Sequence, residues 1–467
     1  MNSLHEAFLE QIDHLLGKEE SKRFQAALTT TPPVSVRINT DKQGAVEGET
    51  VPWCPTGVYL KERPSFTFDP LFHAGTYYVQ EASSMFLSHV LRKYVSEDTF
   101  SHPIVALDLC AAPGGKSTLT LSELPKDSLL IANEVVKQRA NILAENLMKW
   151  GNPNVIVTNN FAEDFQSLGA VFDLIICDVP CSGEGMFRKD EQSISEWSLQ
   201  NVDTCWKRQR NIIQQIWPCL KPSGILIYST CTYNTLEDEE NVKWIQDEMQ
   251  AKVLDCEPDA NWGITGNLLK GESFPCYHFF PHHTKGEGFF LAALQKSDED
   301  GNTASKGKLK KQKHAKQCIS IPKDIKNWVQ NPDSFDFLTE EKTQAFYAFP
   351  KIHTSILEYA QAFLHTLHYG IQLATLKGKN SLQPSHSLAL SNSLNSNLFP
   401  KVELNYEQVI SYLRTESLTL PPVTPLGYVL VCYQNHPLGF VKNLGSRANN
   451  LYPSEWRIRK TLESKLE

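Results

Sequence analysis

Two cysteines stand where apolar runs of the sequence end: Cys181 follows residues 175–179, and Cys231 follows residues 226–228. Such runs are typical of buried strands, and an open parallel sheet binds its ligands beyond the carboxyl ends of its strands. Asp178 stands three residues before Cys181. Two thiols and a carboxyl group at one sheet edge predict an active site that works through a covalent bond. The residues alone leave open which thiol attacks.

Methylation of an unactivated ring carbon is a reaction that needs this set of groups. C5 of cytosine or uracil is a poor nucleophile, so a thiolate first adds to C6 and converts the ring to an enamine whose C5 accepts a methyl group. We expect Asp178, protonated in a desolvated pocket, to donate a hydrogen bond at N3. The second thiol would assist release, when C5 loses its proton and the C6 thioether is eliminated. The base must also leave its stack to reach the pocket.

A cofactor site is indicated by the segment 110–116, Cys-Ala-Ala-Pro-Gly-Gly-Lys, which follows an apolar strand and opens a helix. Its glycines allow close backbone approach, and free N–H groups at a helix start can meet an anion. The spacing is neither GxGxxG nor GxxxxGK[ST], which disfavours a dinucleotide or a P-loop. Glu134, at the end of the next strand, can accept hydrogen bonds from a ribose diol or can simply cap a helix. Together these features favour S-adenosylmethionine over NAD.

The elements that must position these residues alternate between strand and helix. This order is typical of a Rossmann-like doubly wound α/β sheet. We expect strands at 104–109, 129–133, 155–158, 172–177, 225–229 and 288–294, with helices from 117, at 135–150, at 205–220 and after 234. Upstream, the pattern predicts helix over 4–28, a strand at 34–39 and helix over 80–94.

Composition bounds the class of protein. A chain of 467 residues predicts about two to four domains, and no apolar run approaches the roughly 18 residues of a membrane span. No secretory signal is visible, which indicates the cytoplasm. Eleven cysteines without CxxC spacing argue against disulfides and against a metal site. The sequence therefore predicts neither a membrane nor a metal partner, with a monomer as the default.

Charge gives only local indications of nucleic-acid binding. The net charge of −8 is not that of a typical nucleic-acid-binding protein, so such binding must rest on local patches. One patch near the C-terminus contains Lys442 and Arg447, and it is interleaved with Tyr452 and Trp456, whose rings offer stacking faces.

These motifs resemble those of the RNA (cytosine-5)-methyltransferase family of the Sun/Nop2 type, most closely its bacterial RsmF-like members that modify 16S rRNA. The matching stretches are 107–116, 178–189, 228–232 and 288–290, and residues 428–453 resemble a PUA-like RNA-binding module. The resemblance implies 16S rRNA or the small ribosomal subunit as partner, with tRNA as the nearest alternative substrate. A non-catalytic ribosome-assembly factor is the alternative from another class, and the intact motifs argue against it.

The resemblance also implies residue roles. Cys231 is expected to be the nucleophile and Cys181 to assist release, while Lys189 is expected to hold RNA phosphate, as Lys442 and Arg447 are in the C-terminal patch. The implied contacts with S-adenosylmethionine come from Cys110, Ala111, Ala112, Pro113, Gly114, Gly115, Lys116, Glu134 and Asp178. Many relatives have Asp after the third strand to receive the adenine amino group, whereas this chain has Asn160 there.

The expected domain order follows from these motifs and from shifts in composition. The predicted units are an N-terminal α+β accessory domain (1–75), the catalytic domain (76–296), a Lys-rich linker (297–319), an intermediate domain with a connector over 376–398 (320–398), and the PUA-like RNA-binding domain (399–467).

Overall fold

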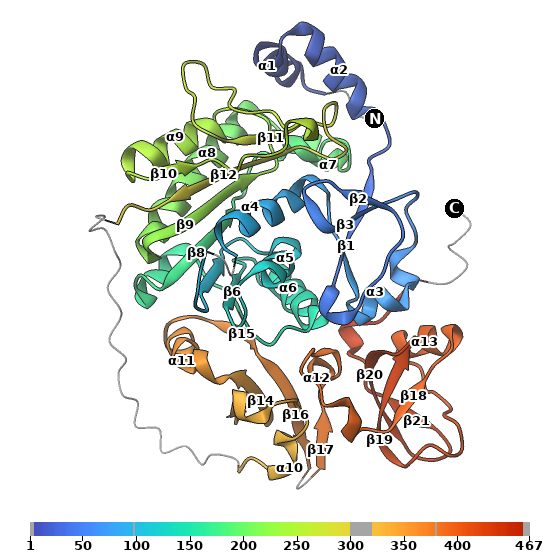
Figure 1. Cartoon of the computed structure of the whole chain (residues 1–467). Helices are drawn as coiled ribbons and strands as arrows, with labels where there is room; N and C mark the ends of the chain where they lie inside the picture. Colours follow the sequence, from blue (N-terminus) through green and yellow to red (C-terminus); the bar gives the residue numbers. More distant parts are fainter. Residues whose placement is uncertain (1–3, 97–98, 299–319, 379–380, 461–467) are drawn as a thin grey trace.

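One large sheet lies at the centre of the chain, as the computed structural model in Figure 1 shows for residues 4–96, 99–298, 320–378 and 381–460. Its strands are β5 (Val105–Asp108), β6 (Leu129–Asn133), β7 (Val155–Thr158), β8 (Phe172–Asp178), β9 (Leu220–Thr230), β10 (Lys252–Leu254), β11 (Tyr277–Phe279), β12 (Phe289–Gln295) and β15 (Thr366–Tyr369). The strand order is β10-β12-β9-β8-β5-β6-β7-β15, and β11 pairs with β12. Strands β5 to β9 run parallel, whereas β12 is antiparallel to β9.

The order of the parallel strands reverses at β5. From there β6 and β7 extend to one side and β8 and β9 to the other. Ligands of open α/β sheets bind in the crevice at such a switch point, outside the carboxyl ends of the strands. The predicted doubly wound α/β fold is therefore confirmed, and its crevice lies beyond Asp108 and Asp178, the last residues of β5 and β8.

Helices cover both faces of this sheet because its strand residues are apolar on both sides. Ala106 and Leu174 pack in one core with α4 (Phe86–Tyr94), α5 (Gly115–Glu123) and α6 (Lys137–Trp150). Leu107 and Ile175 point to the other face, into a core with α8 (Leu199–Ile216), α9 (Glu239–Glu248) and α11 (Thr354–Phe363). The expected helix over 80–94 begins only at Phe86, because the residues before it form a strand and a short 3-10 turn.

The N-terminal region contains a helical hairpin and a small sheet. Its elements are α1 (Glu6–Leu16), α2 (Lys18–Leu28), β1 (Val34–Ile38), β2 (Glu49–Val51), β3 (Cys54–Leu60), α3 (Pro70–Ala74) and β4 (Tyr77–Val79), with sheet order β2-β3-β1-β4. The helical pattern predicted over 4–28 is confirmed, and it forms two helices because Gly17, at φ 80°, separates them. The hairpin lies on the catalytic domain (Figure 1), where Phe8 and Phe24 share a core with Phe187 and Trp197, which lie on either side of α7 (Glu191–Glu196).

Two further sheets follow. The first, in the order β13-β14-β16-β17, contains β13 (Phe335–Glu340), β14 (Ala345–Pro350), β16 (Ile371–Lys377) and β17 (Ser381–Pro384), with α10 (Lys323–Lys326) and α12 (His386–Leu390) nearby. The second, in the order β18-β19-β20-β21, contains β18 (Lys401–Glu403), β19 (Gly427–Tyr433), β20 (His436–Asn443) and β21 (Ala448–Asn450), with α13 (Tyr406–Leu413).

The region after the linker is more integrated than the sequence suggests. Residues 376–398, predicted as a connector, contain β17 and α12, and Leu388 and Ala389 are buried. Strand β15 does not join the sheet formed by β13, β14, β16 and β17. It pairs antiparallel with β7 instead, with Thr366 opposite Thr158, and so forms one edge of the central sheet (Figure 1). The predicted linker at 297–319 lies, apart from its first two residues, outside the described part of the chain. Within that part, every helix is too short or too polar to cross a membrane.

Candidate active site

The two cysteines singled out by the sequence lie side by side beyond the ends of β8 and β9. These strands are parallel neighbours, with Asp178 opposite Ser229. Cys181 Sγ is 3.2 Å from Cys231 Sγ, and the Cys231 backbone N–H donates to Cys181 Sγ at 3.4 Å. Among the described cysteines, only these two and Cys110 are not fully buried. The half-exposed thiols of the described chain thus gather at the crevice.

The two thiols are chemically distinct. The hydrogen bond with Cys231 and, next, burial raise the pKa of the Cys181 thiol well above its ordinary value. Because two sulfur atoms this close hold at most one negative charge between them, a protonated Cys181 can donate its S–H to a thiolate at Cys231. Either sulfur can be the donor in this contact, and a proton kept on Cys181 would leave Cys231 as the acceptor.

Glu184 fixes the turn that follows Cys231. The carboxylate is fully buried just after Cys181. Its oxygens accept hydrogen bonds from Gln11 Nε2 (2.9 Å), Trp197 Nε1 (3.0 Å), Thr232 Oγ1 (2.7 Å), Tyr233 N (2.9 Å), Asn234 N (3.1 Å) and Asn234 Nδ2 (3.1 Å). One side chain thereby joins the segments that carry the two cysteines and also contacts α1. Sequence reasoning missed it, because a lone Glu in a Gly-Glu-Gly turn shows no sign of burial.

A second buried carboxylate, Glu237, supports the same two loops. It accepts the Ser182 backbone N–H at 3.0 Å, Asn234 Nδ2 at 2.8 Å and Gln209 Nε2 at 2.7 Å. Burial raises the pKa of Glu237 to about 6. In the sequence this residue opens a run of four acids, 237–240, a pattern that favours a solvated surface, so its role was not predicted.

Two glycines allow the loops to approach closely. A Cβ added to Gly185 would lie 2.6 Å from Gly288 O and 2.9 Å from Cys231 O. The Gly185 N–H donates to that same Cys231 carbonyl at 2.9 Å. The glycines of the Ser-Gly-Glu-Gly and Gly-Phe-Phe motifs therefore leave room for the backbone that bears Cys231.

Asp178 is tied to the cofactor loop. Its Oδ2 is 2.8 Å from Lys116 Nζ, and its Oδ1 accepts the Ser229 hydroxyl at 2.8 Å. Burial lowers and the Asp178 carboxylate raises the pKa of Lys116, and the net shift is upward. The structure therefore places Asp178, which the sequence predicts as a hydrogen-bond donor to the ring, in an ion pair with Lys116. Lys116, predicted only as a cofactor-loop residue, brings a positive charge beside the thiols.

The loop 110–116 is held against α6 through its carbonyl groups. Arg139 Nη2 donates to Ala112 O at 2.8 Å, and Asn146 Nδ2 donates to Pro113 O at 2.8 Å. Gly114 adopts φ 114°, a conformation that L side chains rarely adopt, directly before α5 begins. The first N–H groups of a helix have no partner within that helix, so this turn offers donors at the crevice.

Buried acids beside this loop match a cofactor that has amino and hydroxyl groups. Asp108 Oδ2 accepts the Ser117 hydroxyl at 2.6 Å, while Oδ1 is buried with no partner among the described residues. Burial raises the pKa of Asp108 to about 7. Glu134, also buried, accepts the Val136 N–H at 2.8 Å through Oε1, and its Oε2 lies 3.3 Å from Arg139. Glu134 therefore caps the turn into α6 and still presents a carboxylate at the end of β6. These residues fit S-adenosylmethionine.

Asn160 stands where the family resemblance leads us to expect an aspartate, and its side-chain amide is already hydrogen-bonded within the protein. Asn160 Oδ1 accepts the His365 N–H at 2.9 Å, and its Nδ2 donates to Asp164 at 3.2 Å, so the amide holds the loop after β7. Next to it, Phe161 is 64 % exposed, and Val135 and Val136 after β6 are 45 % and 48 % exposed. The ends of β6 and β7 thus offer an apolar surface for a nucleobase ring.

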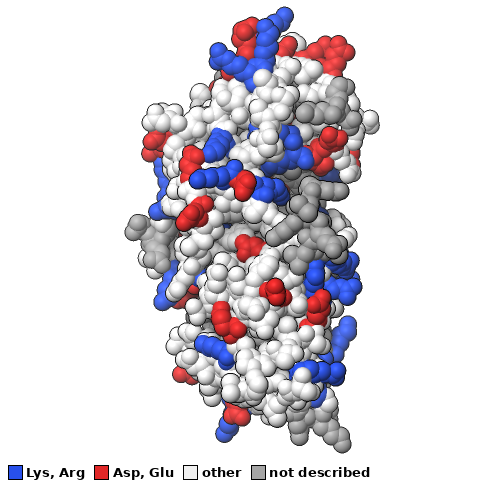
Figure 2. Space-filling view, turned by 90° about the vertical axis from the view of Figure 1, so that its right-hand side faces the viewer, with Lys and Arg blue, Asp and Glu red and all other residues white. Residues whose placement is uncertain are grey.

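The predicted RNA-binding cations differ in their surroundings. Lys189 Nζ lies 3.6 Å from Glu287, an acid that also binds the buried Arg188, so its charge is partly compensated. Lys442 lies over the Tyr428 ring at 5.5 Å, and Arg447 is exposed directly before β21. On the face of the molecule in Figure 2, basic side chains are interspersed with acidic ones.

Comparisons with known proteins agree along nearly the whole chain. Family models match for "16S rRNA methyltransferase RsmB/F" over residues 99–295, for the N-terminal domain of RsmF over 4–82, and for the RsmF PUA domain over 399–458. "Ribosomal RNA small subunit methyltransferase F" of Aliivibrio fischeri is 30 % identical over 97 % of both chains. The protein of that name from Cronobacter sakazakii is 31 % identical over 87 % of this chain and 84 % of its own. The chain belongs to the RsmF family.

Membership of the RsmF family confirms the predicted enzyme class and cofactor: the chain is an S-adenosylmethionine-dependent RNA methyltransferase with a PUA domain at its C-terminal end. Among solved structures, a methyltransferase homologue from Pyrococcus horikoshii is 26 % identical, with a TM-score of 0.53 over 62 % of this chain and 95 % of that one. NSun6 from the same organism, solved with the cofactor analogue SFG, has a TM-score of 0.52 over 62 % of this chain and 98 % of its own at 21 % identity, and it shows the shared fold.

Proposed function

We propose that this enzyme methylates C5 of a cytidine in 16S rRNA through a covalent bond between Cys231 Sγ and C6 of the base. The observation that carries the proposal is the 3.2 Å contact between the two thiols beside the Lys116–Asp178 pair. A methyltransferase that acts on an already nucleophilic nitrogen needs no thiol, whereas C5 needs one. The relatives named rRNA small subunit methyltransferase F support 16S rRNA as the substrate.

Cys231 and Cys181 divide the work of addition and release. The Cys231 thiolate adds to C6, and the electron pair of the C5–C6 bond moves toward C5 and the ring carbonyl and N3. The new bond from C5 to the methyl group takes up that pair. A base then removes the C5 proton, the C5–C6 double bond re-forms, and the C6–S bond breaks to return Cys231 as a thiolate. Cys181, which keeps its proton, supplies a hydrogen bond to that leaving sulfur.

Lys116 and Asp178 place opposite charges beside the position where the ring gains negative charge. As negative charge builds on the ring during thiolate addition, the Lys116 ammonium stabilises it, and Asp178 and Ser229 hold that ammonium and the ring edge in place. When bound, S-adenosylmethionine would supply the methyl group, and its sulfur would keep the electron pair of the broken bond to that methyl group. Asp108, Glu134 and the backbone of 110–116 would hold it.

RNA contacts extend beyond the catalytic crevice. We assign Lys189, beside the catalytic loops, and Lys442 and Arg447, in the PUA domain, to phosphate contacts. Cations that hold phosphate contribute affinity that falls with salt concentration and carries little sequence information. We further infer a monomer that acts in the cytoplasm, where its substrate is made.

The roles of the thiols are tested by trapping the covalent intermediate. Purified full-length Cys181→Ala, Cys231→Ala and wild-type proteins are incubated with cofactor and rRNA from cells that lack the enzyme, then run on denaturing gels. We expect Cys181→Ala to accumulate a protein–RNA adduct, Cys231→Ala to give neither adduct nor methylated product, and the wild type to turn over. The reverse pattern would assign attack to Cys181. Transfer to tRNA but not to rRNA would overturn the proposed substrate.

A further inference from the structure

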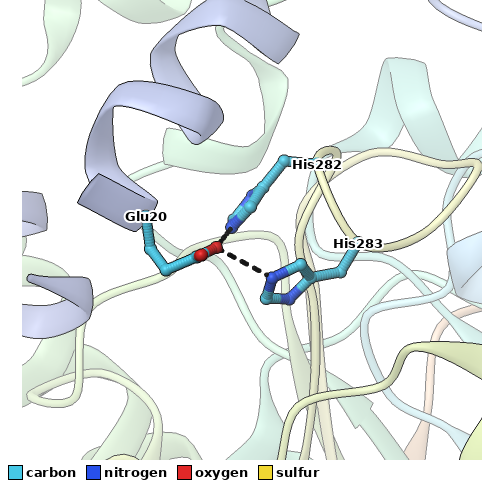
Figure 3. Close-up of side chains that lie close together, drawn as sticks. All are labelled: Glu20, His282 and His283. Atoms are coloured by element: carbon cyan, nitrogen blue, oxygen red, sulfur yellow. Dashed lines mark hydrogen bonds and ion pairs between the residues drawn. The ribbon is translucent and has the colours of Figure 1, made fainter.

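Glu20, His282 and His283 meet at the contact between α2 and the loop that follows β11 (Figure 3). Glu20 projects from α2 toward the two imidazoles, and Figure 3 shows both rings turned toward its carboxylate. Glu20 Oε2 lies 3.4 Å from His282 Nε2 and 3.2 Å from His283 Nε2. One potential ligand atom from each of the three residues lies within 4.8 Å of the others.

These separations are those of neighbouring ligands on a tetrahedral metal ion. Ligand atoms roughly 2.1 Å from a tetrahedral Zn²⁺ lie about 3.3 to 3.4 Å from one another. The Glu20 oxygen stands at this spacing from both imidazoles. Two imidazoles and a carboxylate are also a ligand set that suits Zn²⁺, which completes its coordination with water where the protein supplies three ligands.

The buried ring of His282 makes no hydrogen bond within the described part of the protein. Its side chain is only 3 % exposed, and neither ring nitrogen has a hydrogen-bond partner among the described residues. Buried polar groups are normally hydrogen-bonded, so a buried histidine whose two ring nitrogens make no hydrogen bond needs an explanation. His283 Nε2 has a hydrogen bond with Glu20, whereas His282 Nε2 lies within ion-pair distance of the same oxygen without a hydrogen bond, and His282 Nδ1 has no hydrogen-bond partner among the described residues.

The residues around the cluster orient its ligands. Thr265 Oγ1 lies 3.2 Å from His283 Nδ1, which leaves His283 Nε2 facing Glu20. Arg23 Nη1 binds the other Glu20 oxygen, Oε1, at 2.7 Å. Hydrogen bonds of this kind, on the ligand atoms that do not face the metal, are typical of metal sites. By contrast, the group of Glu239, Cys276 and His278 is fully buried, so it offers no exposed ligand to an ion that arrives from solvent.

We propose that Glu20, His282 and His283 bind one Zn²⁺ ion that fastens the N-terminal hairpin to the catalytic domain. The side chains of Glu20 and His283 are about one third exposed, so the ion and a water ligand can enter from solvent. The sequence predicted no metal, because two adjacent histidines and a glutamate more than 260 positions away form no recognisable spacing.

The site lies behind the catalytic loop. Phe24, one helical turn after Glu20 on α2, packs edge-on against the Tyr233 ring with centroids 5.0 Å apart. Tyr233 follows Cys231 by two residues and its backbone is held by Glu184. A metal ion that holds α2 in place would therefore also hold Phe24 against Tyr233, and so restrict the motion of the turn that follows Cys231.

The test uses Co²⁺, whose visible absorption reports tetrahedral coordination, on full-length protein stripped with a chelator. We expect one Co²⁺ per chain, displaced by one equivalent of Zn²⁺, with no thiolate charge-transfer absorption because no sulfur takes part. Glu20→Gln and His283→Asn should each weaken binding by at least about 100-fold, beyond the 10–100-fold typical of losing a supporting residue. The matched control, Glu19→Gln on the same helix, should bind as the wild type does.

Folding is monitored by circular dichroism in every variant, and Zn²⁺ should raise the melting temperature of the wild type and of Glu19→Gln but not of Glu20→Gln. Three results would each overturn the proposal: no stoichiometric binding by the wild type, undiminished binding by both Glu20→Gln and His283→Asn, or a thiolate spectrum, which would place the ion at Cys181 and Cys231.

Discussion

Replacing Glu184 by Gln tests whether one buried carboxylate organises the catalytic loops. Glu184 accepts hydrogen bonds from six donors, three on each oxygen. Gln keeps the shape but exchanges one oxygen for an NH₂ group, so in either orientation three donors face a donor. An unsatisfied buried donor costs about 1–3 kcal/mol, and partial relaxation brings the expected loss to about 3–5 kcal/mol.

The loss is measured as a shift in thermal unfolding together with methyl transfer. A loss of 3 kcal/mol corresponds to a fall of roughly 6–12 °C in melting temperature for a unit of about 200 residues. Because Tyr233 and the Thr232 hydroxyl lose their anchor, Cys231 moves relative to the base, and a displacement of about 1 Å can reduce the rate roughly 100-fold. The control is Glu191→Gln, an exposed residue at the start of α7. A Glu184→Gln protein that melts within about 2 °C of the wild type and transfers methyl groups normally would refute this reasoning.

Two further predictions concern close packing and pH. Gly185→Ala should lower both the melting temperature and the rate of methyl transfer, because the added Cβ would lie 2.6 Å from the backbone oxygen of Gly288. The control, Gly266→Ala, should change neither, because its Cβ would enter open space. Equal behaviour of the two variants would argue against the steric account. The pKa of Asp108 is raised by burial from its ordinary 3.8 to about 7, so its folded carboxyl group keeps a proton that the unfolded chain releases. The free energy of unfolding should therefore fall as pH rises between about 4 and 7, and Asp108→Asn should flatten that slope in urea titrations across this range.

The sequence was sufficient for features that depend on local pattern. The apolar runs before Cys181 and Cys231 predicted strands that end at one sheet edge, and the structure confirms that the two thiols lie together there. The cofactor loop was equally readable, because a strand, a glycine turn and a helix follow one another within about twenty residues.

Features made by distant segments were not readable. The ion pair of Asp178 with Lys116 could not be predicted, because a residue's own neighbours in the chain do not reveal which charge the fold brings against it. Burial of Glu184 and Glu237 is likewise a tertiary property, since acids are usually exposed. The break at Gly17 could have been suspected from glycine in a helical pattern, whereas nothing near Thr366 indicates that it pairs with Thr158.

The pairing of β15 with β7 makes the central sheet depend on residues that follow 99–295, the range matched by the methyltransferase family model. Residues 366–369 cover the backbone donors and acceptors of β7, and the His365 carbonyl accepts the Asn159 N–H at 3.0 Å. A chain shortened to residue 296 would keep every catalytic residue and still expose an unpaired strand, a template for association with other chains. During synthesis, the sheet is likewise incomplete until some seventy residues after β12 have emerged. The catalytic domain is thus finished by a segment encoded after it.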